Sequence, residues 1–303
     1  MNLEFYNQLI QVVDKDRVLL DEPMSKHTTF RVGGAADYFV MPKCVEEVQK
    51  IVALCHQIDM PYYVIGNGSN LLVSDEGYRG VVLQIYKEMN QIQVVGTTIY
   101  AQAGALLSKV GSVALEAELT GFEFAAGIPG TVGGAVVMNA GAYGGEMKDV
   151  LKSATVLSLD GRVFTLYNSE LELGYRTSVI ASKEYVVLEA TYELQFGDKD
   201  EIRAKMDELK VQRVTKQPLE FPSAGSTFKR PEGYFAGKLI QDAGLRGFRV
   251  GGAQVSEKHC GFVINTGDAT ASDIKELIEL VSDRVLKEFG VKLEPEVKML
   301  GDF

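Results

Sequence analysis

The sequence predicts an α+β protein in which an N-terminal region, residues 1–200, is followed by a C-terminal α+β domain, residues 201–303. Three observations support this prediction. The composition, 46% hydrophobic and 24% charged residues, is that of a folded globular chain. Short strand-like segments are interspersed with segments of helical periodicity. A highly charged helical segment at 197–218 then interrupts the strand-rich pattern and marks the boundary near residue 200.

The N-terminal residues begin with an amphipathic segment, 1–16, whose acidic residues argue against a signal peptide. Residues 36–42 are strand-like and close at Pro42, and 45–57 have the apolar spacing of a helix. Residues 60–66 form an apolar strand that ends in the turn "GNGSN". Together these segments predict a strand–helix–strand unit.

The remaining N-terminal elements are mostly strands. Short strands are expected at 80–86, 91–95 and 98–104, and a helix at 106–118. Residues 151–167 predict a hairpin that turns at Asp160-Gly161. Residues 184–196 alternate as one long strand. We expect the N-terminal region to split into two subdomains near residues 80–90.

The C-terminal domain opens with the charged helix at 197–218, which ends before Pro218. A loop punctuated by glycine and proline follows at 220–237. Residues 270–290 predict an amphipathic helix with Gly290 as its stop, and 291–300 predict the final strand.

Charge and cysteine content exclude several classes. A net charge of −10 argues against broad binding of nucleic acid or acidic membranes. This net charge is still compatible with a local basic pocket that binds an anionic small molecule. Cys44, Cys55 and Cys260 contain no CxxC pair, so neither a disulfide framework nor a metal site is indicated. No apolar run approaches the roughly 18 residues of a membrane span. We expect a cytoplasmic protein.

Two glycine loops are the main functional signal. Residues 66–72, "GNGSNLL", directly follow a strand, and residues 127–145 contain seven glycines. Neither GxGxxG nor GxxxxGK[ST] occurs at its required spacing. Successive glycines nevertheless let backbone N–H groups converge on an anion, so the two loops fit a ligand with a pyrophosphate. The alternative is that they are tight turns and bulges.

Five segments together carry a family resemblance. "YYVIGNGSNLLVSD" and "GFEFAAGIPGTVGGAVVMNAGAYGGE" resemble the FAD-binding segments of the UDP-N-acetylenolpyruvoylglucosamine reductase family. "GYRTS", "PSAGSTFKRP" and "LEPEVK" resemble its catalytic segments, in the family's order. The spacing between "GYRTS" and "GSTFKRP" leaves little room for the tyrosine-bearing loop of the longer family subtype, so the chain resembles the shorter one.

The resemblance implies an FAD-binding fold of the PCMH/VAO type in two subdomains, followed by an α+β substrate domain. It implies non-covalent FAD, because neither glycine loop has a histidine or cysteine to tether it, with NADPH as co-substrate. The implied partners are NADPH and a UDP-sugar, without nucleic acid, membrane or metal, and the chain is expected to be a monomer. The cofactor-binding candidates are Gly66, Asn67, Gly68, Ser69, Asn70, Leu71, Gly127, Ile128, Pro129, Gly130, Gly133, Gly134, Asn139 and Gly141.

The implied reaction reduces the enolpyruvyl group of the UDP-sugar in peptidoglycan synthesis. Arg176 has the planar fork that suits a carboxylate or enolate. Glu296, with Glu294 as a competitor on the same strand face, is expected to contact the carboxylate or orient a proton donor. Ser226 is the expected proton donor. From the residues alone, each also fits an ordinary surface or turn position.

The candidates for UDP binding are Lys216, Lys229, Arg230 and Gln254, each of which also fits a solvated surface position. Arg230 stands where the longer subtype has asparagine. His259 is expected to be structural or to face the substrate. Two other functions stay open: another FAD-linked oxidase or dehydrogenase of the same fold, and a nucleotide-sugar binding module without chemistry.

Overall fold

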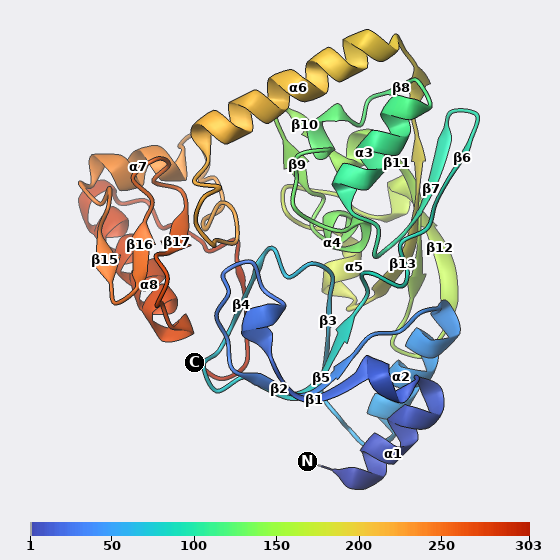
Figure 1. Ribbon diagram of the computed structural model, residues 1–303. Helices are drawn as coiled ribbons and strands as arrows, with labels where there is room; N and C mark the ends of the chain where they lie inside the picture. The colour runs from blue at the N-terminus through green and yellow to red at the C-terminus, as the bar shows by residue number, and fades with distance from the viewer. Residues whose placement is uncertain (1) are drawn as a thin grey trace. The chain divides into compact units, whose positions relative to one another are not determined.

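The computed structural model describes residues 2–303, which group by their contacts into two compact units (Figure 1). The larger unit comprises Met1–Leu20, Tyr38–Asn67 and Gly80–Arg213. The smaller unit comprises Asp21–Asp37, Gly68–Arg79 and Val214–Phe303. Two N-terminal segments therefore group with the C-terminal part of the chain, which no sequence pattern signals. The domain division at residue 200 and the subdomain split stay predictions.

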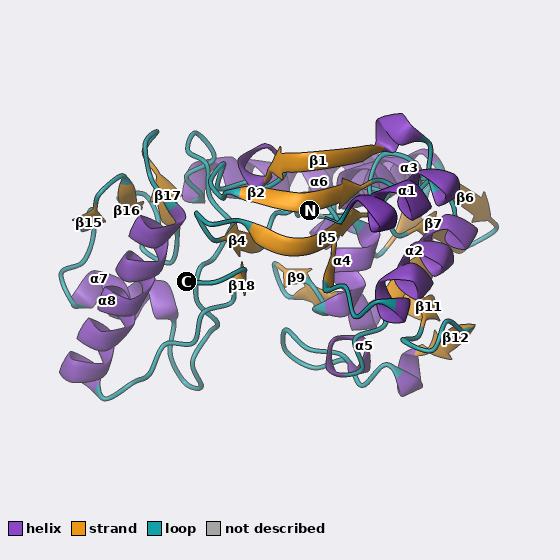
Figure 2. Ribbon diagram, turned by 90° about the horizontal axis from the view of Figure 1, so that it is seen from below, coloured by secondary structure: helices purple, strands orange, loops and turns teal. Residues whose placement is uncertain are grey.

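The first sheet of the chain contains the predicted strand–helix–strand unit. Its order is β1-β2-β5-β3, and Figure 2 shows β1, β2 and β5 side by side. The strands are β1 (Val18–Pro23), β2 (Ala35–Val40), β3 (Tyr62–Ile65) and β5 (Tyr78–Gln84). Strands β3 and β5 are parallel. Helix α2 (Val45–Gln57) packs beside α1 (Leu3–Val12), and it buries the apolar side that the sequence predicts.

The second sheet of the larger unit is antiparallel, in the order β12-β11-β13-β7-β6. Its strands are β6 (Ile92–Val95), β7 (Thr98–Gln102), β11 (Leu151–Leu157), β12 (Val163–Tyr167) and β13 (Val186–Glu193). The hairpin of β11 and β12 confirms the predicted turn at Asp160-Gly161. Helix α4 (Val132–Val137) packs against β13. The other helices are α3 (Leu107–Glu116), α5 (Val179–Ser182) and α6 (Lys199–Lys216), the last of which continues into the smaller unit.

Two sequence predictions in the larger unit are corrected. The segment 184–196 is not one strand, because β14 (Gln195–Phe196) separates from β13 and pairs with β8 (Leu119–Thr120). The Leu194 N–H donates to the Thr97 carbonyl between them. The glycine-rich stretch 127–145 is not only loop, since it contains α4, the strand β9 (Gly141–Ala142) and the start of its partner β10 (Gly145–Glu146).

The smaller unit has a small antiparallel sheet in the order β15-β16-β17, with α7 (Ala236–Asp242) and α8 (Ala271–Phe289) beside it (Figures 1 and 2). Its strands are β15 (Arg249–Val250), β16 (Ala253–Val255) and β17 (Val263–Asn265). Strand β4 (Leu71–Val73) pairs in parallel with β18 (Lys298–Leu300). Helix α8 confirms the predicted amphipathic helix, with a capping box at Thr270 and Gly290 as its left-handed C-cap.

Residues 2–303 contain neither a membrane-spanning helix nor a cluster of metal-binding side chains. Within that range no helix is long and apolar enough to cross a membrane. The same residues contain no group of three or more histidine, cysteine or acidic side chains arranged to hold a metal ion.

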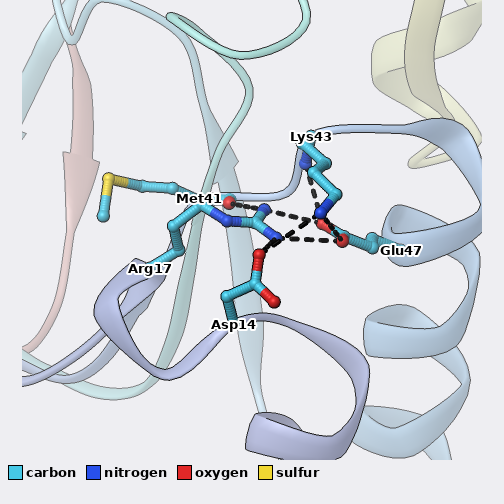
Figure 3. A network of polar contacts seen from close by, with 5 residues as sticks. All are labelled: Asp14, Arg17, Met41, Lys43 and Glu47. Carbon is cyan, nitrogen blue, oxygen red and sulfur yellow. Dashed lines mark hydrogen bonds and ion pairs between the residues drawn. The ribbon is translucent and has the colours of Figure 1, made fainter.

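A buried ion pair fastens the start of α2 to the segment that precedes β1 (Figure 3). The Arg17 Nη1 atom lies 2.8 Å from Glu47 Oε2 and also donates to the Met41 carbonyl at 2.8 Å. The two side chains are only 11% and 10% exposed. Burial raises the pKa of Glu47, but the hydrogen bonds from Arg17 and the Lys43 N–H outweigh it, so the pKa is lowered overall. The pair therefore requires an ionised Glu47.

We expect Glu47→Gln to lower the free energy of unfolding by about 2 kcal/mol at neutral pH, because Arg17 then lies buried without its counter-charge. The pKa of Glu47 is lower in the folded chain than in the unfolded chain. Its contribution is therefore full above the unfolded value and is lost as the pH falls through the folded value. Denaturant unfolding of wild type and variant across acid pH measures this. The exposed neighbour Glu46→Gln is the control, and an equal loss in both variants would contradict the assignment.

Candidate functional site

The two glycine loops meet inside the larger unit. The Asn67 side-chain amide donates to the Pro129 carbonyl at 3.2 Å, which joins the first loop to the second. A Cβ placed on Gly66 would lie 2.1 Å from Thr131 Oγ1, so only glycine permits this approach. The first loop is divided between the units, since Gly66 and Asn67 belong to the larger unit and Gly68 begins a segment of the smaller one.

The glycines of the second loop differ in what surrounds them. The Gly130 N–H donates to the Ile128 carbonyl, and the Gly133 N–H donates to the Ala103 carbonyl. A Cβ on Gly133 would lie 3.1 Å from the Ala103 side chain. A Cβ on Gly134 would meet only Thr131 Oγ1, at 3.7 Å, and the Gly134 N–H has only a long 3.5 Å bond to that hydroxyl. Among residues 2–303, no atom lies close enough to Gly134 to give a packing reason for glycine at this position.

Asn139 is fully buried, and the protein uses both ends of its side-chain amide. Its amide nitrogen donates to Glu146 Oε2 at 2.8 Å and to the Gly174 carbonyl at 2.9 Å. Its amide oxygen accepts the Lys148 N–H at 2.9 Å. These bonds engage the Asn139 side chain in holding the turn that carries Arg176, and its role as a cofactor contact stays a prediction.

Arg176 occupies this turn with φ 56°, a left-handed conformation that is uncommon for a residue with a side chain. Its Nη2 atom donates to the Gly141 carbonyl at 3.2 Å, and its guanidinium lies 5.2 Å from the centre of the Tyr175 ring. The turn is closed by the isolated bridge between Gly174 and Thr177. The backbone on both sides of Arg176 therefore fixes the position of its Cα, from which the side chain extends.

Arg213, near the end of α6, is a residue that sequence reasoning missed. Its buried Nε atom has no hydrogen-bond partner among the described residues 2–303. Burial lowers the pKa of the guanidinium, and Tyr143 opposes that shift. A Cβ on Gly127 would lie 3.7 Å from the Arg213 side chain, so this cation sits beside the second glycine loop. The sequence did not distinguish Arg213 as a site residue, because it lies in a highly charged helix and the charges of such helices are usually solvated.

The rest of the first loop belongs to the smaller unit and supports the last catalytic segment. A Cβ on Gly68 would lie 2.0 Å from the His27 carbonyl oxygen. The Asn70 side-chain amide donates to the Glu296 carbonyl at 3.1 Å, and the Asn70 carbonyl accepts the Lys298 N–H at 3.0 Å. Asn70 therefore positions the segment that contains Glu296.

Thr227, which no sequence signal identifies, joins the segments of Ser226 and Glu296. It is fully buried, and its N–H donates to the Gly261 carbonyl at 2.8 Å. Its carbonyl accepts the Glu296 N–H at 2.8 Å, and its hydroxyl accepts the Val263 N–H at 2.9 Å. The structure thus brings two of the three predicted catalytic residues onto neighbouring segments of the smaller unit, while Arg176 belongs to the larger unit.

The backbone that leads into Ser226 is also constrained. Gly225 has φ 77°, which glycine adopts without strain. Ser226 itself is exposed, between Gly225 and the buried Thr227. The serine hydroxyl is therefore accessible while the peptide on its C-terminal side is held in the interior.

The predicted strand at 291–300 is corrected, since only Lys298–Leu300 form β18. Pro295 has no N–H to donate and makes only an isolated bridge to Phe228. Glu294 and Glu296 therefore lie before β18, on either side of this isolated bridge. Glu294 is 66% exposed and forms an ion pair with Lys229 at 3.2 Å.

The four predicted UDP-binding residues make different kinds of contact within the protein. Arg230 packs its guanidinium on the Phe235 ring at 4.1 Å and donates to the Tyr234 carbonyl. The Gln254 amide donates to the Gly247 carbonyl at 3.1 Å. Lys216 is the last residue of α6. With Lys229 in its ion pair, all four stay predictions as substrate contacts.

Comparisons with known proteins agree with this architecture. Residues 36–167 match the family described as FAD binding domain, and residues 217–300 match the family described as UDP-N-acetylenolpyruvoylglucosamine reductase, C-terminal domain. A UDP-N-acetylenolpyruvoylglucosamine reductase of Agathobacter rectalis is 56% identical, and the alignment covers 100% of both chains.

Solved structures support the same assignment. The UDP-N-acetylenolpyruvylglucosamine reductase of Thermus caldophilus superposes with a TM-score of 0.80 at 36% identity, over 94% of this chain and 98% of that chain. The glucose dehydrogenase Phl p 4.0202 shares the fold alone, with a TM-score of 0.52 at 12% identity over 95% of this chain and 63% of that chain. The predicted fold of the PCMH/VAO type is confirmed. The chain belongs to the UDP-N-acetylenolpyruvoylglucosamine reductase family and contains that family's FAD-binding domain.

Proposed function

We propose that this protein is an FAD-containing oxidoreductase that uses NADPH to reduce the enolpyruvyl group of UDP-N-acetylglucosamine enolpyruvate to UDP-N-acetylmuramate. This reaction belongs to peptidoglycan synthesis. The proposal rests on family membership over the full chain, together with the placement of Ser226 and Glu296 on segments joined by Thr227. We further propose that it acts as a monomer in the cytoplasm, with residues 201–303 as its substrate domain.

The described residues fit FAD on structural grounds. In the part of the chain that the structure describes, no atom lies closer than 3.7 Å to a Cβ placed on Gly134, and the buried Nε atom of Arg213, beside Gly127, has no hydrogen-bond partner. A buried arginine of this kind suits a pyrophosphate. Asn67 and the loop backbone add short polar groups. FAD, when bound, would carry the reducing equivalents from NADPH to the substrate.

The protein residues supply charge stabilisation and a proton. Negative charge develops on the enolpyruvyl carboxylate during reduction, and the permanently charged Arg176 guanidinium stabilises it. The neighbouring carbon then requires a proton, which the Ser226 hydroxyl donates. Glu296, held by its N–H on the Thr227 carbonyl, orients the donor or contacts the carboxylate.

The two half-reactions test the function directly. Under anaerobic conditions NADPH alone should bleach the bound flavin, and enolpyruvyl-UDP-N-acetylglucosamine added afterwards should restore its colour. Recovery of UDP-N-acetylmuramate completes the assignment. A flavin that NADPH bleaches but the enolpyruvyl substrate leaves bleached would refute the proposed substrate.

Substitution of Gly134 tests the flavin site. We expect Gly134→Val to weaken FAD binding by about tenfold or more, which corresponds to roughly 1.4 kcal/mol or more. The melting temperature of the apoprotein should change little, because valine is no worse than glycine in a helix and its Cβ would lie 3.7 Å from the nearest atom, Thr131 Oγ1. Gly133→Val is the contrast, since its side chain would press on Ala103 and lower stability as well. Normal flavin content in Gly134→Val would exclude Gly134 from the flavin site.

Removal of Arg176 tests the charge-stabilising role. We expect Arg176→Ala to slow the substrate half-reaction by about a hundredfold or more, as for other groups that stabilise developing charge. Flavin reduction by NADPH should be much less affected. Arg162→Ala, at the 78% exposed tip of the hairpin, is the control and should behave as wild type. Equal losses in both half-reactions would instead assign Arg176 to general binding.

Removal of the Ser226 hydroxyl tests the proton donor. We expect Ser226→Ala to retain FAD, bind substrate and react with NADPH normally, while the substrate half-reaction falls by about 10²–10⁴-fold. Single-turnover stopped flow without oxygen measures it. Ser223→Ala, three residues earlier in the same loop, is the matched control. A Ser226→Ala rate within about threefold of wild type would exclude Ser226 as the acid.

A further inference from the structure

His259 follows β16 in the smaller unit and lies half-buried among backbone groups. Its ring packs edge-on against Phe262, with the ring centres 5.0 Å apart. A Cβ on Gly237 would lie 3.3 Å from the imidazole Cε1, and a Cβ on Gly261 would lie 3.0 Å from the same atom. Glycines from two separate segments therefore leave room for this ring.

The imidazole makes a specific hydrogen bond as well as a packing contact. Its Nδ1 atom accepts the Gly261 N–H at 3.1 Å. A ring nitrogen that accepts a hydrogen bond carries no proton, so this contact requires the neutral imidazole. Burial lowers the pKa of His259, which favours that form. The His259 N–H in turn donates to the buried Ser256 hydroxyl at 3.3 Å, so the turn is fixed at both ends.

Gly261, whose N–H the imidazole binds, contacts the proton-donor segment through its carbonyl, which belongs to the next peptide unit. The carbonyl of Gly261 accepts the Thr227 N–H at 2.8 Å, and that nitrogen is bonded directly to the carbonyl carbon of Ser226. Two residues further on, the Val263 N–H donates to the Thr227 hydroxyl at 2.9 Å. His259 therefore lies one hydrogen bond from Gly261 and two from the residue after Ser226.

We propose that His259 is a positioning residue for Ser226: by accepting the Gly261 N–H it holds Gly261 in place, and the carbonyl of Gly261 holds Thr227 and so sets the direction of the serine hydroxyl. His259 itself does not contact the reacting atoms. This inference rests on the proposed proton-donor role of Ser226. A displacement of about 1 Å in a catalytic group is enough to lower a rate substantially, up to roughly a hundredfold.

Two substitutions separate the hydrogen bond from the packing. His259→Phe keeps an aromatic ring for Phe262 and removes the acceptor. His259→Asn removes the ring but keeps an acceptor, because an asparagine oxygen readily accepts the N–H two residues ahead. His56→Phe is the control, since His56 lies in α2 of the larger unit and packs on Tyr62.

We expect His259→Phe to slow the substrate half-reaction by about tenfold or more. Substrate affinity and the NADPH half-reaction should stay near wild type. His259→Asn should recover most of the rate, and His56→Phe should match wild type. Amide hydrogen exchange at Thr227 should be faster in His259→Phe than in His259→Asn. This readout does not depend on catalysis, and it applies even when a variant loses flavin or stability.

A double-mutant comparison completes the test. In a Ser226→Ala background, His259→Phe should cause no further loss, because the two residues act as one unit. Equal rates for His259→Asn and His259→Phe would overturn the proposal, as would an undiminished loss in the Ser226→Ala background. If Ser226→Ala alone retains the wild-type rate, the donor assignment fails. If Ser226→Ala collapses and His259→Phe does not, only the role of His259 fails.

Discussion

The hydrogen bonds of Thr227 are the constraint on which the proposed proton-transfer chemistry depends. Its N–H, carbonyl and hydroxyl each bond to a different partner, Gly261, Glu296 and Val263. A buried peptide whose polar groups are all satisfied is costly to displace, since each broken bond would leave an unpaired group in the interior. Thr227 therefore holds Ser226 as its covalent neighbour and Glu296 through the N–H of that residue.

The same arrangement recurs at the other polar positions of the chain. Asn139 uses its whole amide to hold the turn of Arg176, and Asn70 uses its amide to hold the carbonyl of Glu296. Both asparagines lie in glycine-rich segments that suggested direct ligand contact. Their side chains support the segments that carry Glu296 and Arg176, and both asparagines stay predictions as cofactor contacts.

Periodic elements were predictable because their signal is local. The helices at 45–57 and 270–290 bury the faces that their spacing indicates, and Asp160-Gly161 turns the expected hairpin. The motifs also identified the family, since five ordered segments match it together. Pro295 interrupts the strand that the sequence pattern predicts at 291–300. The lack of an N–H at that position argued for the later start of β18 at Lys298.

Long-range contacts were not predictable from one sequence. Thr227 is an ordinary threonine in a loop. Its structural role comes from hydrogen bonds to Gly261 and Glu296, which lie far from it along the chain. Arg213 is one cation among many on a charged helix, and only its burial beside Gly127 distinguishes it. His259 left two readings open, because a histidine can either face a ligand or support the backbone.

The central claim is that the proton-donor segment is assembled before any ligand binds. Native-state amide hydrogen exchange of the ligand-free protein, followed at Thr227, Val263 and Glu296, tests it most directly. We expect these three amides to be strongly protected and to open together, with protection close to that of the buried strands of the smaller unit. Rapid exchange in the free protein, with protection only after FAD and substrate are added, would contradict it.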